Sequence, residues 1–411
     1  MTAISFDQGL ADMGQQKIRW AGRSMPLLKG IEKRLSQTGV LTGLRIGISL
    51  VLEPKTANLA LALQTAGADV SVFGASADGA KADVVAALTA KGIKVLAASG
   101  GAADDLAKAR ALLATSPQIL LDDGAFVIRV AHREFPGLVS DMVGAAEETT
   151  SGVRPLLEMQ KAGELQLPVI SVNDVRLKHT FDNLYGTGQS CVMALLDVTN
   201  LQIAGRRVLV VGYGWVGRGV ALHCAALGAK VIVAELDPIK ALQALHDGHL
   251  AMSVADAAPS AEVVFAATGI VGVVTPDHVC AMPEGAILCT AGGGDYELPM
   301  DYLRSVGAPR ALRQDVAEYQ TGAGKSVLVI AEGHCINCAA AEGNPIEIMD
   351  LSLSLQASAA EFLATKGRSL PPGLHPLPPE VEAALAAQRV HLAGGSLEPM
   401  TPELEHAIRR W

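Results

Sequence analysis

The sequence predicts an α/β protein with two doubly wound parallel-sheet domains and a small C-terminal segment. Short runs rich in valine, isoleucine and leucine alternate with longer alanine- and leucine-rich stretches of helical period over most of the 411 residues. This alternation is typical of βαβ units in a parallel sheet that helices cover on both faces. It occurs in two successive series, and a chain of this length has room for two or three domains.

The first series predicts a domain over residues 1–185. A long helical stretch from about Ile346 to Lys366 is long enough to return the chain to this domain, so we expect residues 346–395 to complete it. The expected strands are Leu44–Leu52, Asp69–Phe73, Lys94–Leu96, Gln118–Leu121 and Pro168–Val172, with helices at Pro54–Thr65 and Lys81–Ala90.

The second series predicts a domain over residues 186–345. Five prolines between positions 371 and 379 then mark a turn-rich connection. We expect residues 396–411 to form a short C-terminal tail. The expected strands of the second series are Arg207–Val211, Lys230–Ala234, Glu262–Ala266 and Ala286–Cys289.

The composition argues against several classes of partner. A net charge of −9 without a basic cluster argues against nucleic acid. Half of the residues are hydrophobic, yet no uncharged apolar run is long enough to span a bilayer, so no membrane partner is expected. The N-terminus lacks the basic start and apolar stretch of a signal peptide, and a cytoplasmic protein is therefore expected.

The cysteines predict neither a disulfide framework nor a metal site. All six lie from Cys191 onward, which fits a reducing compartment. Cys335 and Cys338 form a CxxC, a pattern also found in redox pairs and in half of a zinc site. No second CxxC or paired histidine accompanies it, so we expect two buried thiols and no metal.

A glycine-rich turn directly follows the first strand of the second series. After Arg207–Val211 the chain has glycine at 212, 214 and 217, and residues 215–227 have the apolar spacing of a helix. Gly212 permits a tight turn, Gly214 lets the backbone approach a pyrophosphate, and Gly217 lets the helix pack on the strand. The start of the helix offers free N–H groups to phosphates. The pattern predicts a Rossmann dinucleotide site.

An acidic residue after the next expected strand indicates whether NAD or NADP binds. The next expected strand ends at Ala234, and Glu235 follows it, where a carboxylate accepts from the adenosine ribose hydroxyls. A carboxylate there repels a 2′-phosphate, so NAD is expected rather than NADP. The alternative is a glycine turn without a ligand, because this glycine pattern alone is weak evidence.

From residue 118 onward the chain resembles the S-adenosylhomocysteine hydrolases, and a match at 52–70 extends the likeness to most of its length. The glycine motifs are similar to those of the shorter bacterial and archaeal branch of that family. The segments that carry the resemblance are LEPKTANLALALQTAGADV (52–70), LLDDGA (120–125), GAAEETTSGV (144–153), SVNDVRLKHTFDNLYGTGQS (171–190), VVGYGWVGRG (210–219), AELDPIKALQA (234–244), AEGHCINCAAAEGNP (331–345) and EIMDLSLSLQA (347–357).

The resemblance implies a reaction in which tightly bound NAD acts as a resident catalyst. NAD oxidises C3′ of a nucleoside thioether, the ketone acidifies the C4′ proton, the 5′-thiol is eliminated, water adds, and NADH reduces the ketone. This chemistry needs a base for the 3′-hydroxyl proton and a second base at C4′. The resemblance also implies a substrate-binding first domain, an NAD-binding second domain, and a homotetramer, with a dimer as the alternative.

Carried over position by position, the family's motifs imply roles for residues of this chain. Lys178 and Asp182 match the pair at the 3′-hydroxyl, Glu148 matches the ribose-binding carboxylate, and Asp123 matches the residue near C4′ and C5′. We expect a lowered pKa to let Lys178 act as a base. The implied cofactor-binding residues are Thr149, Thr150, Ser151, Asn183, Gly212, Gly214, Trp215, Val216, Gly217, Glu235, Lys240, Ala291, Gly292 and Asn337. The further implied substrate-binding residues are Glu53, Lys55 and Asn344.

Each of these residues also has a purely structural interpretation. Asp123 or Glu148 could cap a strand end or a helix start. Lys178 and Asp182, four residues apart, could form an exposed ion pair on a helix. All four lie in their family motifs together, which favours the functional interpretation.

The chain departs from the family at three histidines. Val51, Gly293 and Asn344 stand where the family carries histidine, and the segment 75–81 lacks the family's STQD loop. In the family these histidines lie around the base and the 5′ leaving group. Histidine is the side chain best able to move protons at neutral pH, and elimination and hydration at C5′ need such movement.

Three hypotheses about function follow. The first is the family reaction, which converts S-adenosylhomocysteine to adenosine and homocysteine. The second is a redeployed enzyme that oxidises C3′ and then eliminates, adds or epimerises on another nucleoside. The third is a catalytically silent NAD-binding partner protein, against which the retained Lys178 and Asp182 argue.

Overall fold

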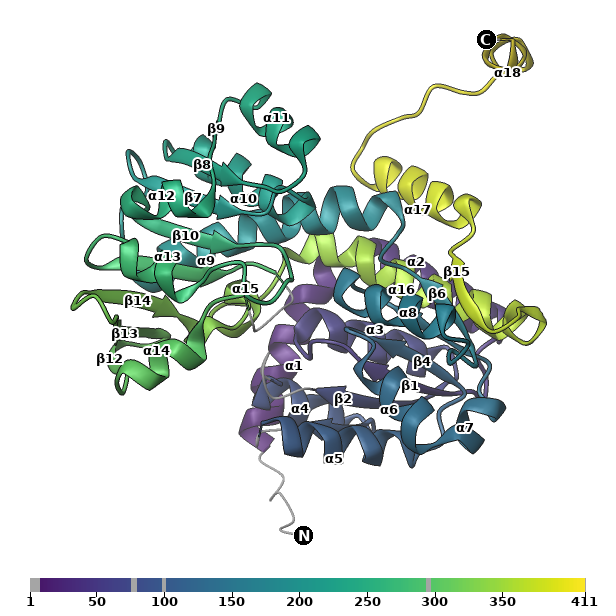
Figure 1. Ribbon diagram of the computed structural model, residues 1–411. Helices are drawn as coiled ribbons and strands as arrows, with labels where there is room; N and C mark the ends of the chain where they lie inside the picture. The colour runs from purple at the N-terminus through teal and green to yellow at the C-terminus, as the bar shows by residue number, and fades with distance from the viewer. Residues whose placement is uncertain (1–7, 75–79, 98–100, 293–296, 411) are drawn as a thin grey trace.

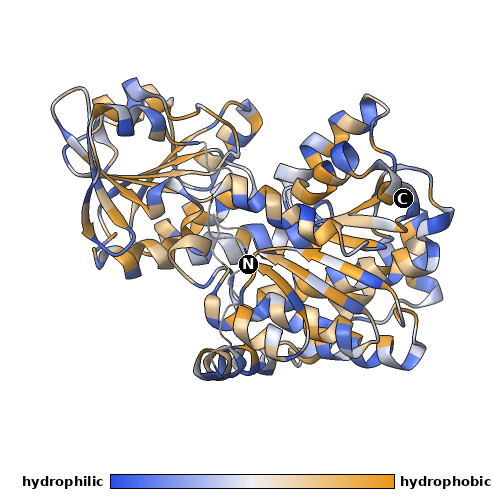
Figure 2. Cartoon of the chain, turned by 90° about the horizontal axis from the view of Figure 1, so that it is seen from below, coloured by the Kyte–Doolittle hydropathy of each residue, from blue (hydrophilic) through white to orange (hydrophobic). Residues whose placement is uncertain are grey.

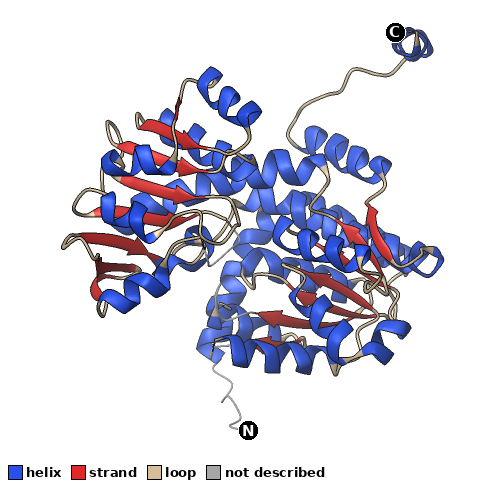
Figure 3. Ribbon diagram, viewed as in Figure 1, coloured by secondary structure: helices blue, strands red, loops and turns tan. Residues whose placement is uncertain are grey.

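The computed structural model describes residues 8–74, 80–97, 101–292 and 297–410, which form two α/β units (Figure 1). Figure 2 shows apolar strands inside both units, with polar residues concentrated on the surrounding helices. In Figure 3 the strands of the two sheets point toward the helices that lie between the units. The carboxyl ends of both sheets therefore face this central region, where ligands of doubly wound sheets bind.

The first sheet has the strand order β15-β6-β5-β4-β1-β2-β3, and each neighbouring pair is parallel. The helices α1 and α2 precede it, and α3 to α8 alternate with its strands. The strands are β1 (Arg45–Ser49), β2 (Asp69–Gly74), β3 (Lys94–Ala97), β4 (Ile119–Asp122), β5 (Gly144–Glu147), β6 (Pro168–Ser171) and β15 (Gly373–Pro376). The helices are α1 (Gln8–Arg23), α2 (Pro26–Thr38), α3 (Pro54–Thr65), α4 (Ala82–Ala90), α5 (Ala102–Leu113), α6 (Phe126–Glu134), α7 (Pro136–Asp141) and α8 (Thr150–Lys161).

The chain returns to this first sheet after the second one. Helix α16 (Ile346–Lys366) packs against β4, β5, α2 and α3, and its buried side chains join the same hydrophobic core. Asp350 of α16 accepts from the backbone N–H groups of Leu27 and Leu28 and so satisfies the start of α2. Strand β15 and helix α17 (Pro379–Leu392) follow. We propose domain limits of 1–185 with 346–395, and 186–345, which follow the two sheets.

The second sheet has the strand order β12-β13-β14-β11-β10-β7-β8-β9. From β9 to β14 this is the 3-2-1-4-5-6 order of a Rossmann fold. At the far edge, β13 pairs antiparallel with both β12 and β14, a departure from the expected all-parallel sheet, because short connections close a hairpin on each side of β13. The strands are β7 (Arg207–Val211), β8 (Lys230–Ala234), β9 (Leu250–Ala251), β10 (Val263–Ala266), β11 (Ala286–Thr290), β12 (Arg310–Arg313), β13 (Val316–Gln320) and β14 (Ser326–Ile330).

Helices flank this sheet and connect it to the first unit. A π-helix, η1 (Lys178–Thr187), runs directly into α9 (Gly188–Thr199) and leads from the first unit to the second. The terminal helix α18 (Pro402–Arg409) stands away from the body and has no buried residue (Figure 1). The remaining helices are α10 (Trp215–Ala226), α11 (Pro238–His246), α12 (Val254–Ala257), α13 (Pro276–Ala281), α14 (Met300–Val306) and α15 (Ile336–Ala339).

The described residues contain neither a membrane-spanning helix nor a metal-binding cluster. Across the described part of the chain, no helix combines the length and the apolar character needed to cross a bilayer. Within the same residues, no group of three or more histidine, cysteine, aspartate or glutamate side chains is arranged to hold a metal ion.

Candidate active site

A buried lysine lies between two carboxylates in the central region. The Nζ atom of Lys178 is 2.8 Å from Oδ2 of Asp182 and 2.9 Å from Oε1 of Glu148. Lys178 and Asp182 belong to η1, whereas Glu148 directly follows β5. All three side chains are buried, so the interpretation of Lys178 and Asp182 as an exposed helical pair is wrong. Buried charges of this kind persist only when they are paired and hydrogen-bonded.

Helix α16 holds the two carboxylates in place. The hydroxyl of Ser352 donates to Oδ2 of Asp182 at 2.5 Å, and the amide of Gln356 donates to Oε2 of Glu148. These two residues are four positions apart and therefore lie on one face of the helix. The sequence analysis did not single out either residue, although both lie in the EIMDLSLSLQA motif.

The electrostatics of this cluster differ from those expected for a lysine that acts as a general base. Burial disfavours the charged amine, but the carboxylates of Asp182 and Glu148 outweigh it and raise the pKa of Lys178. This is the opposite of the lowered Lys178 pKa that was expected beside a nicotinamide. Burial raises the pKa of Glu148, against the lowering effect of Lys178.

Asp123 lies at the end of β4 beside the Thr149 hydroxyl. The Oγ1 atom of Thr149 is 2.9 Å from Oδ1 of Asp123, 3.0 Å from Oε1 of Glu147 and 3.0 Å from the Ser151 hydroxyl. Thr150 is exposed, and its hydroxyl donates to the buried Asn173. The hydroxyls expected to contact NAD thus lie at the start of α8, at the carboxyl ends of the strands of the first sheet.

Asn344 stands at one of the substituted histidine positions and joins the lysine cluster. Its Nδ2 atom donates to Oδ1 of Asp182 at 2.9 Å and to the Thr187 hydroxyl at 3.1 Å. Its Oδ1 atom accepts from Asn337 at 2.9 Å and from the Ser190 hydroxyl at 2.9 Å. Asn344 therefore links the cofactor candidate Asn337 to Asp182. Ser190 is a member of this network that the sequence analysis missed.

A second buried ion pair lies beside the same segment. Nζ of Lys55 is 2.5 Å from Oε2 of Glu53 and also donates to the carbonyl oxygen of Glu342. Burial raises the pKa of Glu53 to about 7, against the lowering effect of Lys55. Val51, at another substituted histidine position, lies just after β1 and is half-buried. Gly293, the third position, lies outside the described residues.

The glycine-rich turn has the shape that a dinucleotide requires. Gly212 has φ of +95°, in the left-handed region, and a Cβ at Gly217 would lie 1.9 Å from the carbonyl oxygen of Gly212. A Cβ at Gly214 would meet no atom within 4 Å, so the space there is open to a ligand. Trp215 and Val216 begin α10 directly after this opening. Trp215 is exposed and lies edge-on to His179.

Glu235 holds the turn from the end of β8. Its carboxylate accepts from the backbone N–H groups of Tyr213 at 2.7 Å, Leu236 at 2.7 Å and Asp237 at 3.0 Å. Burial acts against ionisation, but these N–H groups outweigh it and lower the pKa of Glu235. Lys240, 3.9 Å from Asp237, adds a favourable charge nearby. An ionised carboxylate at this position fits the ribose of NAD and disfavours NADP.

Comparison with known proteins identifies the family. Two family models match, "S-adenosyl-L-homocysteine hydrolase, NAD binding domain" over residues 183–343 and "S-adenosyl-L-homocysteine hydrolase" over residues 4–135. The S-inosyl-L-homocysteine hydrolase of Methanopyrus kandleri is 41% identical over 408 residues, which are 98% of this chain and 96% of the relative. The adenosylhomocysteinase of Nostoc sp. is 40% identical, with 98% and 96% covered, and that of Thermococcus kodakarensis is 40% identical, with 98% and 97% covered.

This chain belongs to the S-adenosyl-L-homocysteine hydrolase family. It is therefore an enzyme of a hydrolase family, and its cofactor is NAD. The expected resemblance, fold class and cofactor are confirmed. The open space at Gly214 and the carboxylate of Glu235 are consistent with this cofactor.

The other candidate residues of this family member lie around the same central region. Ala291 and Gly292 follow β11, and a Cβ at Gly292 would lie 2.4 Å from the carboxylate of Glu297. Asn183 lies half-buried in η1, one residue after Asp182. Cys335 donates its thiol to Asn337 at 3.0 Å, and both CxxC thiols are half-buried rather than buried as expected.

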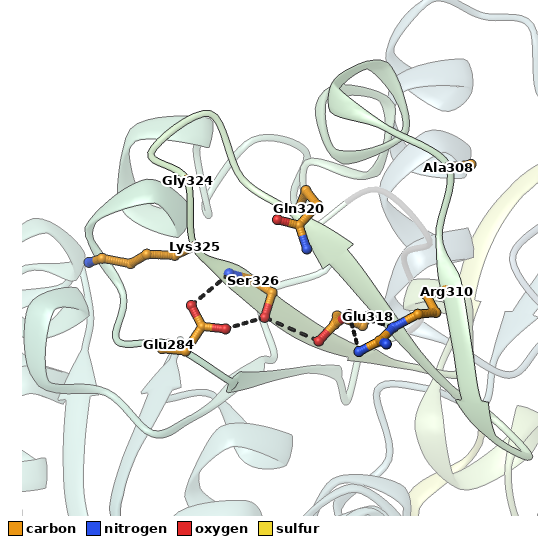
Figure 4. A pocket seen from close by; sticks show the side chains of 8 residues that line it. All are labelled: Glu284, Ala308, Arg310, Glu318, Gln320, Gly324, Lys325 and Ser326. Carbon is orange, nitrogen blue, oxygen red and sulfur yellow. Dashed lines mark hydrogen bonds and ion pairs between the residues drawn. The ribbon is translucent and has the colours of Figure 1, made fainter.

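A pocket of about 530 Å³ lies away from this region (Figure 4). Glu284 accepts there from Ser326, and Arg310 pairs with Glu318 at 2.8 Å. Glu284 precedes β11 and Ser326 begins β14, so the pocket lies at the amino ends of these strands. The carboxyl ends, at the opposite edge, face the residues described above.

Proposed function

We propose that this enzyme cleaves an S-nucleosyl-homocysteine thioether through transient oxidation of ribose C3′. The observation that supports the proposal most strongly is the buried cluster of Lys178, Glu148 and Asp182. Three ionisable groups in hydrogen-bond contact can accept and redistribute the proton of a sugar hydroxyl. A catalytically silent NAD-binding protein would have no use for a buried charge cluster, which is costly to maintain.

The chain's own groups can carry the protons of the C3′ and C4′ steps in this scheme. NAD, when bound, accepts the C3′ hydride and later returns it. Lys178 holds a proton while it is paired with both carboxylates, so it acts as a base only after this proton has passed to solvent. The neutral amine then accepts the 3′-hydroxyl proton. Asp123 removes the C4′ proton, the C5′–S bond breaks, homocysteine thiolate leaves, and water adds to the resulting C4′=C5′ bond.

Glu53 and Lys55 are suited to a purine with a mixed donor and acceptor edge. Adenine presents an amino donor beside a ring acceptor, whereas hypoxanthine presents a carbonyl acceptor beside an N–H donor. The carboxylate of Glu53 accepts and the ammonium of Lys55 donates, so the pair can satisfy either base. By their names, the Methanopyrus kandleri relative acts on the S-inosyl compound and the Nostoc relative on the S-adenosyl compound. Both thioethers are therefore proposed substrates.

A redeployed activity is the second candidate. Val51 cannot donate or accept a proton, and the amide of Asn344 is engaged with Asp182. Both positions carry histidine in the family that this chain resembles. An enzyme that keeps C3′ oxidation but has lost proton movement at C5′ would oxidise, exchange or epimerise a nucleoside without cleaving the thioether efficiently.

One experiment separates these candidates. The purified protein is incubated with S-adenosylhomocysteine, S-inosylhomocysteine and a panel of nucleosides. NADH absorbance reports oxidation, a thiol reagent reports cleavage, and mass spectrometry identifies the products. Release of homocysteine supports the first candidate, and NADH formation without thiol supports the second. If no compound produces either signal, the proposed function is wrong.

A further inference from the structure

Two buried carboxylates have no role in the proposed reaction, but each directly precedes an acidic residue that has one. Asp122 and Glu147 end the adjacent parallel strands β4 and β5 and are partners in the sheet register. Both side chains are completely buried, and each precedes a carboxylate of the proposed reaction, Asp123 or Glu148. Fully buried acids are rare unless their oxygens have specific partners.

Glu147 accepts hydrogen bonds from the turn that carries Asp123. Its Oε1 atom accepts from the backbone N–H of Gly124 at 2.9 Å and of Thr149 at 3.0 Å, and its Oε2 atom accepts from that of Ala125 at 2.9 Å. One side chain thus joins the end of β4 to the start of α8.

This turn has two consecutive residues in the left-handed region, and the second of them is not glycine. Gly124 has φ of +74°, and Ala125, a residue with a Cβ, has φ of +52° and is completely buried. Left-handed residues other than glycine cluster at functional sites and persist only where the surrounding structure holds them. The contacts from Glu147 reach the N–H groups of both residues and provide that support.

The space around Glu147 is closely fitted. A Cβ at Gly152 would lie 2.2 Å from Oε1 of Glu147 and 2.6 Å from the backbone nitrogen of Ala125. Gly152 therefore leaves room for the carboxylate against the turn. The hydroxyl of Thr149 completes the connection, because it contacts Oδ1 of Asp123 and Oε1 of Glu147.

We propose that Glu147 is a positioning residue that fixes the Asp123 carboxylate for proton removal at C4′. It acts through the turn at Gly124 and Ala125 and through the Thr149 hydroxyl. The inference rests on the proposed function, in which Asp123 removes the C4′ proton. Among the described residues, the Glu147 side chain forms no hydrogen bond or ion pair with the Lys178 cluster, so it should affect the C4′ step and not hydride transfer.

The test measures both steps in one variant. Glu147→Gln keeps the size of the side chain but turns an NH2 group toward backbone N–H donors. With the better of S-adenosylhomocysteine and S-inosylhomocysteine, stopped-flow NADH absorbance measures hydride transfer, and deuterium uptake from D2O measures exchange at C4′. We expect C4′ exchange to fall about 10- to 100-fold relative to hydride transfer, the range for a displaced catalytic group.

A matched control separates positioning from general stability. Asp350→Asn alters another buried carboxylate with two backbone donors, outside the cluster, and should leave the ratio of the two rates unchanged. If Glu147→Gln fails to fold, Thr149→Val removes the hydroxyl that contacts both Asp123 and Glu147. Because Thr149 is also a cofactor-binding candidate, the two rates are compared at equal NAD occupancy; Thr149→Val should lower the same ratio, and Thr149→Ser should keep it.

The outcomes distinguish this inference from the proposed function. An unchanged ratio, or equal losses in both steps, overturns the role of Glu147 and leaves the proposed function intact. A wild-type enzyme that forms NADH but exchanges no C4′ proton overturns the proposed C4′ chemistry, and the role of Glu147 with it.

Discussion

The amino group of Lys178 lies 2.8 Å from the carboxylate of Asp182 within a π-helix, and both side chains are buried. Exposed ion pairs contribute little to stability, but a buried pair is costly to break because the remaining charge loses its partner. Glu148 shares the same amine at 2.9 Å. Removing one member therefore changes the charge state of the other two, and the three groups act as a unit.

Lys178→Ala should abolish NADH formation by the substrate and leave the cofactor bound. The 3′-hydroxyl proton must leave as the hydride does, and loss of general-base assistance costs about 100- to 10,000-fold. Single-turnover NADH absorbance measures the rate, and dinucleotide released on heating measures occupancy. Lys161→Ala, which breaks an exposed pair with Glu158, is the control. Wild-type NADH formation in Lys178→Ala would contradict a catalytic role.

Ser352→Ala should slow hydride transfer about 10- to 100-fold, because a hydrogen bond to a charged group contributes about 1.5–3 kcal/mol. Ser352 donates to Asp182, whereas Ser354 on the same helix is buried and its hydroxyl has no hydrogen-bond partner in the described part of the chain. Ser354→Ala is therefore the matched control and should keep the wild-type rate. Equal rates in the two variants would show that Ser352 does not support Asp182.

Most strands rich in β-branched residues were expected, although β14 (Ser326–Ile330) was not, and a strand without such residues was missed. Arg207–Val211 and Lys230–Ala234 have the expected bounds, since each carries several buried valines or isoleucines. Strand β5, Gly-Ala-Ala-Glu, was not expected, because its small residues have low strand propensity and only packing between β4 and β6 forms it. This missed strand positions Glu148.

Only the site residues that lie in sequence motifs could be predicted; their burial and their long-range contacts could not. The motif containing Lys178 and Asp182 did not reveal that both side chains are buried in a π-helix. Gln356 lies 208 positions from Glu148, so no local pattern could show their hydrogen bond. The raised pKa of Lys178 depends on the same long-range arrangement, which is why the expected lowering was wrong.

Glu235→Ala should weaken NAD binding and narrow the preference over NADP. The variant removes the acceptor for the ribose hydroxyls and the charge that repels a 2′-phosphate. It also releases the N–H of Tyr213 in the glycine-rich turn. Calorimetric titration of the stripped protein with each dinucleotide measures the effect. Asp237→Ala, which removes the cap of α11 and the pair with Lys240 but keeps the Glu235 carboxylate, is the control. Unchanged discrimination would mean that Glu235 does not meet the ribose.

Asp122 should make stability depend on pH in the acidic range. Burial raises its pKa from 3.8 to about 7, so the folded protein holds a proton that the unfolded chain releases near pH 4. The free energy of unfolding should therefore fall as pH rises from about 4 to about 7. Asp122→Asn cannot release this proton, and its denaturant midpoint should vary less over the same range. Parallel pH profiles for the two proteins would contradict the raised pKa.

Val51→His should restore proton movement at C5′ if loss of histidine limits the enzyme. C3′ oxidation and C4′ exchange use Lys178, Glu148, Asp182 and Asp123, which are all present. Departure of the thiolate and entry of water need a proton carrier that valine cannot provide. In the unmodified protein we therefore expect C4′ exchange with D2O to exceed release of homocysteine.

The histidine variant should raise homocysteine release more than it raises C4′ exchange, because only the 5′ steps gain a proton carrier. Val51→Asn has a polar side chain that cannot titrate, and it is the control for a change in polarity alone. Thiol release and deuterium uptake are followed in the same reaction, so that differences in substrate binding cancel in their ratio. If the wild-type enzyme releases thiol as fast as it exchanges the C4′ proton of the substrate, this hypothesis is wrong. It would show instead that Asp123 and water suffice for the 5′ chemistry.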